Sequence, residues 1–552
     1  MKQRITRATT AQRGAVLIAT LLVMTVLLVQ GLTFLAVAQT EDTVASNYRN
    51  HTQTFYAAEA GLEAGVVGLR ALLAATPTPT PTALGGLLPP TLTDPNYSFT
   101  TFQVAYIRPT PYATTIDTGP YAGLLAQTTD FRITAAVTGP RQSRTQLQQV
   151  VKYLEIPLFQ FGVFYGTGVD LEIAPGPPMT FNGRVHANSN IYVRNASMQF
   201  DSFVTTVGNV YRYLKRDPAT RGSDPQIRDG SGTYQVLNFD HDTDPGFTNP
   251  WAVQDWRTAA LGTFDGLVRD SAMGVQEIIP PLPDLFYDPA NPDVVAHQLI
   301  ERGTAADSPE LQAAKLYYQA DLRIEDTTGT AKHKDGTPVT LPAGVVTPKT
   351  FYDKREEANI TVLELDISAL MASGEAPQNG ILYVAHDGLH KGVRLVNGTQ
   401  LPGQGFTVVS ENPVYIQGDY NTVNKVPAAV LADAITVLST NWGPNNSDSK
   451  GAQVTSNRPA SNTTVNAAFA LGPNAESAVG QGNGQLENVI RFLENWNGKT
   501  FTYNGSIIAL WHSLQATGNW RCCGNAGDNY YRPPNRNWAY DPLFNTNLAP
   551  GT

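Results

Sequence analysis

The chain has 552 residues, and only 15% of them are charged, a low share for a soluble cytoplasmic protein. Its net charge of −9 argues against nucleic-acid binding, because neutralising phosphate groups requires a basic surface. Cys522 and Cys523 are the only cysteines, which excludes a disulfide-rich scaffold.

The first predicted element is an apolar helix over residues 15–39, a segment without any charged residue. At about 1.5 Å per residue, a helix of this length spans the ~30 Å hydrocarbon core of a bilayer. Four basic residues precede it and no acidic one does: Lys2, Arg4, Arg7 and Arg13. Because basic residues stay on the cytoplasmic side, the pattern predicts a single-pass protein of the bacterial inner membrane with its body outside the cytoplasm.

The fate of this N-terminus has three interpretations. A cleaved secretory signal would use the small residues Ala36 and Ala38 and leave Gln39 as the new N-terminus, but the apolar run exceeds the ~7–15 residues of a usual signal core. A plain single-pass anchor is the second. The third is the start of a filament subunit after removal of a leader.

The residues after the apolar run favour the third interpretation. No proline occurs before Pro77, so one helix over residues 15–76, about 90 Å long, is predicted. Its outer half places apolar residues on one stripe: Phe55, Leu62, Leu69 and Leu73, with Tyr48 and Val66 nearby. Small residues there would permit close approach of a neighbour: Ala57, Ala58, Ala60, Gly61, Gly65 and Gly68.

Residues 12–70 resemble a known family. Arg13-Gly14 followed by Ala15-Val16-Leu17-Ile18 is similar to a prepilin leader that ends at the peptidase glycine, and "FYAAEAGLEAG" (residues 55–65) resembles the N-terminal region of PilX-type pilus-assembly proteins. The resemblance implies a leader over residues 1–14, cleavage after Gly14 by a prepilin peptidase, and a mature chain that begins at a methylated Ala15. It also implies that residues 15–73 contact other pilins or pilin-like subunits.

One position departs from the pattern of most pilins, which carry a glutamate five residues into the mature chain. That position is Ala19 here. The resemblance implies that the glutamate pairs with the terminal amine of an adjacent subunit, so its absence argues against a subunit repeated along a shaft. A minor subunit that acts at a filament tip or in priming assembly is therefore predicted, with a membrane-anchored adhesin or polysaccharide-binding or polysaccharide-cleaving protein as the alternative.

Beyond the helix the predicted fold class is α+β and mostly β. The Thr/Pro repeat at residues 77–82 predicts a semi-rigid extended spacer. Residues 83–156 predict a small pilin-like sheet on the helix, with alternating strands at residues 97–107, 130–139 and 145–156.

Residues 157–552 predict a β-rich head. Very short strands with Asn and Gly corners favour a β-solenoid, with asparagines in ladders at the corners, and a β-sandwich is the alternative. Residues 215–373 read as an insertion of loops and helices, including a helix at 308–322 that Ser308 caps. Another helix is predicted at residues 485–498.

No catalytic motif is found, and no enzyme activity or resident cofactor is expected. His186 reads as a structural histidine. His386 and His390 have the spacing of a helical metal pair, but Gly388 between them and the strand before them disfavour a helix.

Two further sets of residues carry alternatives. Asp240, Asp242 and Asp244 alternate in one loop and could wrap Ca²⁺, but Pro245 and Trp251 depart from a calcium loop, so a solvated acidic turn is favoured. The adjacent Cys522 and Cys523 leave open a strained disulfide, a bond to another chain or two buried thiols. The aromatic residues of the same loop are expected to be buried: Trp520, Tyr530, Tyr531, Trp538 and Tyr540.

Overall fold

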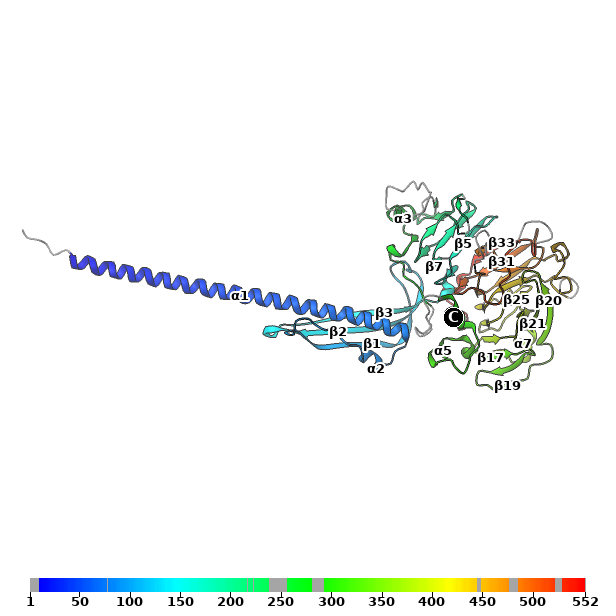
Figure 1. Ribbon diagram of the computed structural model, residues 1–552, viewed down its shortest axis with the longest axis horizontal. Helices are drawn as coiled ribbons and strands as arrows, with labels where there is room; N and C mark the ends of the chain where they lie inside the picture. The colour runs from blue at the N-terminus through cyan, green and yellow to red at the C-terminus, as the bar shows by residue number, and fades with distance from the viewer. Residues whose placement is uncertain are drawn as a thin grey trace, which may run out of the picture. The chain divides into compact units, whose positions relative to one another are not determined.

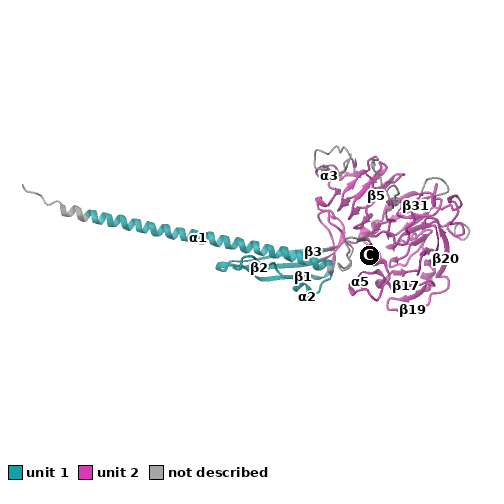
Figure 2. Cartoon of the chain, viewed as in Figure 1, with its two compact units in different colours: residues 1–111, 129–153 teal, residues 112–128, 154–552 magenta. Residues whose placement is uncertain are grey.

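The computed structural model describes residues 9–76, 78–215, 217–221, 223–237, 256–279, 292–443, 448–475, 485–521 and 529–551. The chain divides into two compact units (Figure 2). Unit 1 comprises residues 1–111 and 129–153, and unit 2 comprises residues 112–128 and 154–552.

Helix α1 (Thr9–Ala75) is continuous, as the absence of proline before Pro77 predicts (Figure 1). Threonine hydroxyls in its apolar part bond to the preceding turn of the same helix, for example Thr25 Oγ1 to the Leu21 carbonyl at 2.7 Å. These hydroxyls therefore need no partner outside the helix.

The Thr/Pro repeat is not an extended spacer throughout, which corrects the prediction for residues 77–82. Helix α2 (Pro81–Gly85) begins inside it, with proline at its first position and Thr80 as the cap that accepts from the Ala83 amide at 3.2 Å. The Tyr106 hydroxyl donates to the Pro79 carbonyl at 2.7 Å. The chain thus folds back onto unit 1 immediately after α1.

A three-stranded sheet lies along the outer half of α1 (Figure 1) and confirms the predicted small sheet. Its strands, in spatial order, are β1 (Ser98–Thr115), β2 (Leu125–Thr138) and β3 (Arg144–Glu155). Phe131 and Ile133 of β2 pack with Leu69 and Leu73 of α1 in one buried cluster. The central strand therefore supplies most of the contact with the helix.

The body of unit 2 is mostly β, and its largest sheet has twelve strands in the order β16-β10-β7-β4-β32-β29-β26-β24-β22-β17-β18-β19. Every pairing from β16 to β17 is parallel, whereas β18 pairs in antiparallel fashion with both β17 and β19. The strands in chain order are β4 (Val163–Tyr165), β7 (Val185–Ala187), β10 (Val204–Thr206), β16 (Val268–Arg269), β17 (Leu322–Glu325), β18 (Thr330–His333), β19 (Pro338–Val339), β22 (Ile381–Val384), β24 (Phe406–Ser410), β26 (Ala428–Ala432), β29 (Ala468–Leu471) and β32 (Ile507–Ala509).

One column of buried apolar side chains fixes the register of this sheet. The column contains Leu322, Leu382, Val408, Val430, Phe469, Ile507, Val163, Val185, Val204 and Val268, in spatial order. All of these side chains belong to one core cluster. A slip by one residue would turn the whole column away from the core, so the register is strongly specified.

Five smaller sheets complete unit 2. Their orders are β11-β8-β5, β12-β13, β15-β14-β9-β6, β20-β21-β23-β25-β27-β30 and β28-β31-β33. Their strands are β5 (Leu171–Ile173), β6 (Met179–Phe181), β8 (Ile191–Val193), β9 (Met198–Phe200), β11 (Val210–Tyr211), β12 (Tyr213–Leu214), β13 (Asp217–Arg221), β14 (Gln226–Arg228), β15 (Tyr234–Val236), β20 (Val346–Asp353), β21 (Ala358–Asp366), β23 (Lys391–Val396), β25 (Val414–Gln417), β27 (Ile435–Leu438), β28 (Thr463–Asn466), β30 (Arg491–Phe492), β31 (Thr500–Gly505) and β33 (Asn535–Tyr540).

Spatial order in the large sheet differs from chain order. The chain enters at β4, proceeds through β7 and β10 to β16 at one end, and resumes at β17 near the other end. From there it advances strand by strand to β32, which pairs with β4. Residues 270–321, here called the return segment, connect the two ends.

Helical turns are confined to short pieces of unit 2. They are α3 (Trp256–Phe264), α4 (Pro292–His297), α5 (Pro309–Ala314), α6 (Leu316–Gln319) and α7 (Ile367–Ser373), with 3₁₀ turns at Leu158–Gln160, Ser271–Met273, Gln298–Ile300, Thr455–Asn457, Leu486–Asn488 and Pro542–Asn545.

Polar side chains form ladders at the corners, as the sequence predicts. Asn466 and Asn421 exchange amide-to-carbonyl hydrogen bonds of 2.9 and 2.8 Å, and Asn504 donates to the Asn466 side chain at 2.7 Å. At another corner the Asp170 carboxylate accepts from the Asn190 amide nitrogen at 2.9 Å. These bonds satisfy polar groups at positions where the strands end.

Three predictions for unit 2 need correction. Strands β17 and β21 pair in parallel with β22 and β23, so the second part of residues 215–373 belongs to the main sheets and not to an insertion. The helix predicted at 308–322 is two short helices, α5 and α6, although Ser308 does cap the first of them. Residues 485–498 form a 3₁₀ turn and strand β30 instead of a helix, because Arg491 pairs with Thr436 of the neighbouring strand.

Candidate functional site

The apolar part of α1 lies bare along its whole length in this chain. Large apolar side chains from Val16 to Val37 are 49–74% exposed. Among the described residues this is the one helix long and apolar enough to cross a membrane, and its most apolar window has a mean hydropathy of 2.5 and no buried residue. Exposing so much apolar surface to water is unfavourable, so the segment needs lipid or other helices around it.

The outer half of α1 has a different environment. Thr54 and Ala58 are fully buried beneath the sheet, and the Thr54 hydroxyl bonds to the Thr145 hydroxyl at 2.9 Å. A Cβ atom on Gly61 would lie 2.6 Å from a ring carbon of Phe99, and one on Gly65 would lie 2.6 Å from Ile133. The glycines therefore admit the chain's own sheet, and not a neighbouring molecule as the sequence suggested.

The predicted apolar stripe of the outer half is only partly right. Leu69 and Leu73 are buried, and Leu62 and Val66 are partly buried against the same cluster. Tyr48 and Phe55, in contrast, are 75% and 44% exposed. The stripe that meets the sheet runs instead through residues 54, 58, 61, 65 and 69.

The expected processing position lies inside α1. Gly14 and Ala15 both have helical backbone, and Ala15 and Ala19 are exposed. Cleavage between Gly14 and Ala15 stays a prediction.

Two sets of sequence-predicted site residues lie outside the described residues. They are the acidic loop with Asp240, Asp242 and Asp244 and the pair Cys522 and Cys523. The calcium alternative and the state of the cysteines therefore stay predictions. Within the described part of the chain, no group of three His, Cys, Asp or Glu residues is placed to hold a metal ion.

His186 is a buried structural histidine, as predicted. Its Nδ1 atom bonds to the Thr205 hydroxyl at 2.9 Å and its Nε2 atom to the Asn188 amide oxygen at 3.0 Å. The ring stacks on Phe164 with 5.2 Å between centroids. Burial lowers the pKa of His186 to about 4, so the ring is neutral at pH 7.

His386 and His390 do not lie on a helix, as the sequence predicts, but in the loop between β22 and β23. The aromatic residues near the C-terminus are largely buried, also as expected. Tyr530 and Tyr531 are 3% and 2% exposed, and the others pack partly against the cores: Trp520, Trp538 and Tyr540.

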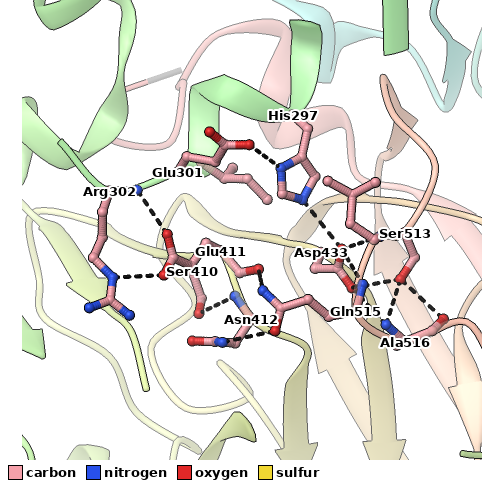
Figure 3. Close-up of polar contacts among 12 residues, drawn as sticks. His297, Glu301, Arg302, Ser410, Glu411, Asn412, Asp433, Ser513, Gln515 and Ala516 are labelled. Atoms are coloured by element: carbon pink, nitrogen blue, oxygen red, sulfur yellow. Dashed lines mark hydrogen bonds and ion pairs between the residues drawn. The ribbon is translucent and has the colours of Figure 1, made fainter. Parts of the chain in front are cut away.

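A buried polar network that sequence reasoning missed joins the return segment to the large sheet (Figure 3). Asp433, which follows β26, is fully buried and lies at its centre. Its carboxylate accepts from the Ser513 hydroxyl at 2.6 Å and from the backbone amides of Leu514 and Ala516 at 2.6 and 3.1 Å. His297 Nε2 faces it at 3.3 Å.

A second part of the network lies on the neighbouring turn. Arg302 of the return segment donates from its backbone amide and its Nε atom to the Glu411 carboxylate at 2.9 and 2.7 Å (Figure 3). The Gln515 side chain donates to the Glu411 carbonyl at 2.7 Å. The return segment and the loop after β32 are thus held at the same turn of the large sheet.

The order of groups in this network argues against nucleophilic catalysis. In a serine hydrolase the histidine lies between serine and acid, where it removes the serine proton. Here Asp433 lies between Ser513 and His297, and the other ring nitrogen of His297 bonds to Glu301 at 2.9 Å. The histidine has no access to the serine hydroxyl, so the arrangement is a structural clamp.

Burial lowers the pKa of His297, but hydrogen bonds to and charges on Asp433 and Glu301 outweigh it and raise the pKa to about 9. The pKa of Asp433 is lowered, since the hydrogen bonds and the charge of His297 outweigh its burial. The pair is therefore ionised at pH 7.

The clamp predicts a dependence of stability on pH. Because the folded pKa of His297 exceeds its unfolded value, its contribution is fully present below about pH 6.5 and is lost as pH rises through about 9. We expect the free energy of unfolding to fall by about 2 kcal/mol over this window. Urea unfolding at a series of pH values, followed by tryptophan fluorescence, measures it. The variant His297→Gln should lack this decline, and an equal decline in both proteins would contradict the assignment.

Buried carboxylates elsewhere in unit 2 do not form an accessible acid pair. Burial raises the pKa of Glu487 and of Glu494 to about 7. Glu494 is fully buried and accepts from the Ser439 amide and hydroxyl at 2.6 and 2.7 Å. Glu487 is 4% exposed and accepts from the Ala174 amide at 3.3 Å. Both groups are used by the fold and are closed to a polysaccharide.

A cavity between β33 and β6, lined by Trp538, Tyr540 and Phe181 among others, has a volume of about 30 Å³. That is room for a water molecule and not for a sugar ring. An open depression near Asp366 and Asn397 is lined by one carboxylate only. A glycosidase needs two carboxylates across a groove, and neither hollow supplies them.

Comparison with known proteins gives one match. Residues 13–63 match the family model of the PilX N-terminal region, which covers the bare part of α1 and the start of its contact with the sheet. No curated protein and no solved structure matches the chain. The chain thus carries a PilX-type N-terminal region followed by a large β-rich body, and this region points to a pilin-like protein related to the type IV pilus.

Proposed function

We propose that this chain is an exported, pilin-like subunit of a type IV pilus or a related secretion filament. The observation that carries the proposal is the PilX match on a helix whose inner half is bare and uncharged and whose outer half is covered by a small sheet. Residues 15–39 anchor it in the inner membrane and later in the filament, and unit 2 lies outside the cytoplasm. The basic residues before Gly14 support this orientation.

A minor role at a tip or in priming assembly is the more specific part of the proposal. Ala19 is exposed on α1 and has no charge with which to pair the amine of an adjacent subunit. Unit 2 also includes residues 154–552, a body too large to repeat conveniently along a thin filament. Both features favour one or a few copies per filament.

We infer that the body of unit 2 is a β-solenoid. Parallel pairing of short strands, one in-register column and corner ladders of asparagine support this interpretation over a sandwich, whose sheets are antiparallel. We propose that the body serves in assembly or surface contact without catalytic residues, in keeping with the order of groups around Asp433. The prepilin peptidase and other pilins are the proposed partners.

Surface filaments sheared from the native cell test the minor role. Quantitative mass spectrometry should find the chain in the sheared fraction at far fewer copies than the main subunit. Equal copy numbers would make it a shaft subunit. Presence in the membrane fraction alone, in cells that do make filaments, would leave a membrane-anchored head and would contradict the proposal.

A further inference from the structure

A strict seven-residue repeat runs through the bare part of α1. Val16, Val23, Gln30, Val37 and Val44 follow one another at intervals of seven. A second set lies three residues after each of the first four: Ala19, Val26, Thr33 and Thr40. Alternating spacings of three and four place both sets on one face of a helix, which we call the seam.

The seam differs in chemistry from the opposite face. Its side chains are β-branched or small, with one amide, whereas the opposite face at the same depths is leucine: Leu17, Leu21, Leu28 and Leu35. Helices that pack in membranes use small side chains at the contact, and β-branched residues at the first heptad position favour two-stranded pairs. Leucine suits the lipid.

The same repeat continues into the outer half of α1, where its packing is seen directly. Thr54, Ala58, Gly61, Gly65 and Gly68 are later members of it, and the chain's own sheet covers this stripe. The seam is therefore continuous with an established packing face of the helix. Only its inner part, through Val44, has no cover in the single chain.

Gln30 is the one seam residue that demands a specific partner. The threonines of the span bond within the helix, as Thr33 does to the Val29 carbonyl at 2.8 Å. The exposed Gln30 side chain makes no hydrogen bond to a described residue, and next to it Gly31 has no atom within 4 Å of a Cβ position. An unpaired amide in the hydrocarbon core is unfavourable.

A carboxamide is both a donor and an acceptor, so two glutamines can pair reciprocally. Two parallel copies of this helix place Gln30 opposite Gln30 at the same depth, since the same residue has the same distance from the membrane surface in both. One polar residue at a single first heptad position also fixes the register of such a pair.

We propose that two copies of this chain pair in the membrane as parallel, in-register helices through the seam, with the Gln30 amides bonded to each other. Helices that cross at about 20° near Val26 are separated by about 15 Å at the level of Thr54, which leaves room for each sheet beside the partner helix. The pair depends on insertion of α1 into the membrane but not on a filament.

The test uses the full chain in membranes of a host without pilus machinery, with Cys522→Ser and Cys523→Ser as background. Val37→Cys places a thiol on the seam, and Leu35→Cys places one on the opposite face at nearly the same depth. Under mild oxidation the seam variant should form disulfide dimers several-fold faster. Adding Gln30→Leu should lower the dimer fraction of the seam variant by roughly 3- to 10-fold.

The matched control is Leu28→Val, on the opposite face, which should leave the dimer fraction unchanged. Equal cross-linking from both faces, or no effect of Gln30→Leu, would overturn the pairing while leaving the filament proposal intact. Extraction of the chain by alkali would instead contradict membrane insertion, and both proposals would fail. Cross-linking of Val37→Cys only to another protein would also overturn a pair of identical chains.

Discussion

The variant Asp433→Ala is expected to lower the free energy of unfolding of unit 2 by about 3–5 kcal/mol, the usual cost of removing one partner of a buried ion pair. The Asp433 side chain is fully buried and serves His297, the Ser513 hydroxyl and three consecutive backbone amides, of residues 514–516. Without it these donors lie buried with no acceptor, and the charge of His297 loses its main counter-charge.

Tryptophan fluorescence in a urea titration measures this loss, because the ring of Trp511 lies 5.8 Å from that of His297. The matched control is Asp387→Ala, which removes a 48% exposed carboxylate paired with Arg302 of the same return segment. Its expected cost is at most about 1 kcal/mol, since water screens exposed pairs. Equal effects of the two substitutions would show that the buried network is not what holds the return segment.

Gly61→Leu is expected to separate the sheet of unit 1 from α1. An ideal Cβ atom at Gly61 already lies 2.6 Å from Phe99 and 2.9 Å from the Cβ atom of Ala135, and leucine adds three further carbons. Overpacking of this kind costs about 3 kcal/mol, more than the ~1 kcal/mol that replacing a helical glycine returns. Amide hydrogen exchange of β2 should become faster by about 10-fold or more.

Gly31→Leu is the control for Gly61→Leu. It makes the same substitution in the same helix, but no atom lies within 4 Å of the new Cβ position. Exchange of β2 should not change in this variant. If Gly61→Leu also left the exchange rates unchanged, the close contact between helix and sheet would be refuted.

Local sequence patterns predicted the elements whose stability is local. The uncharged run, the lack of proline before Pro77 and the alternation in residues 130–139 are sufficient to predict α1 and β2. Residues 485–498 show why such patterns fail elsewhere. Their spacing is helical, but Arg491 pairs with Thr436 in the neighbouring strand, and tertiary pairing overrides the local preference.

The order of the large sheet and the network around Asp433 depend on residues far apart in the chain. Ser506 bonds to the Phe161 carbonyl across 345 positions, and His297 faces Asp433 across 136. No local pattern contains such pairings. One signal was present: Asp433 is a single acid inside the apolar run 428–438, and an acid in a buried strand is nearly always paired. The sequence does not name its partner.

The most direct test of the proposed filament role is the mass of the mature N-terminus in native membranes and in sheared surface filaments. We expect a chain that starts at Ala15, with Gly14 as the last residue of a removed leader. A chain that starts at Gln39 would make the protein an ordinary secreted one. An intact Met1 would leave a simple membrane anchor, and either of these results would contradict the pilin-like role.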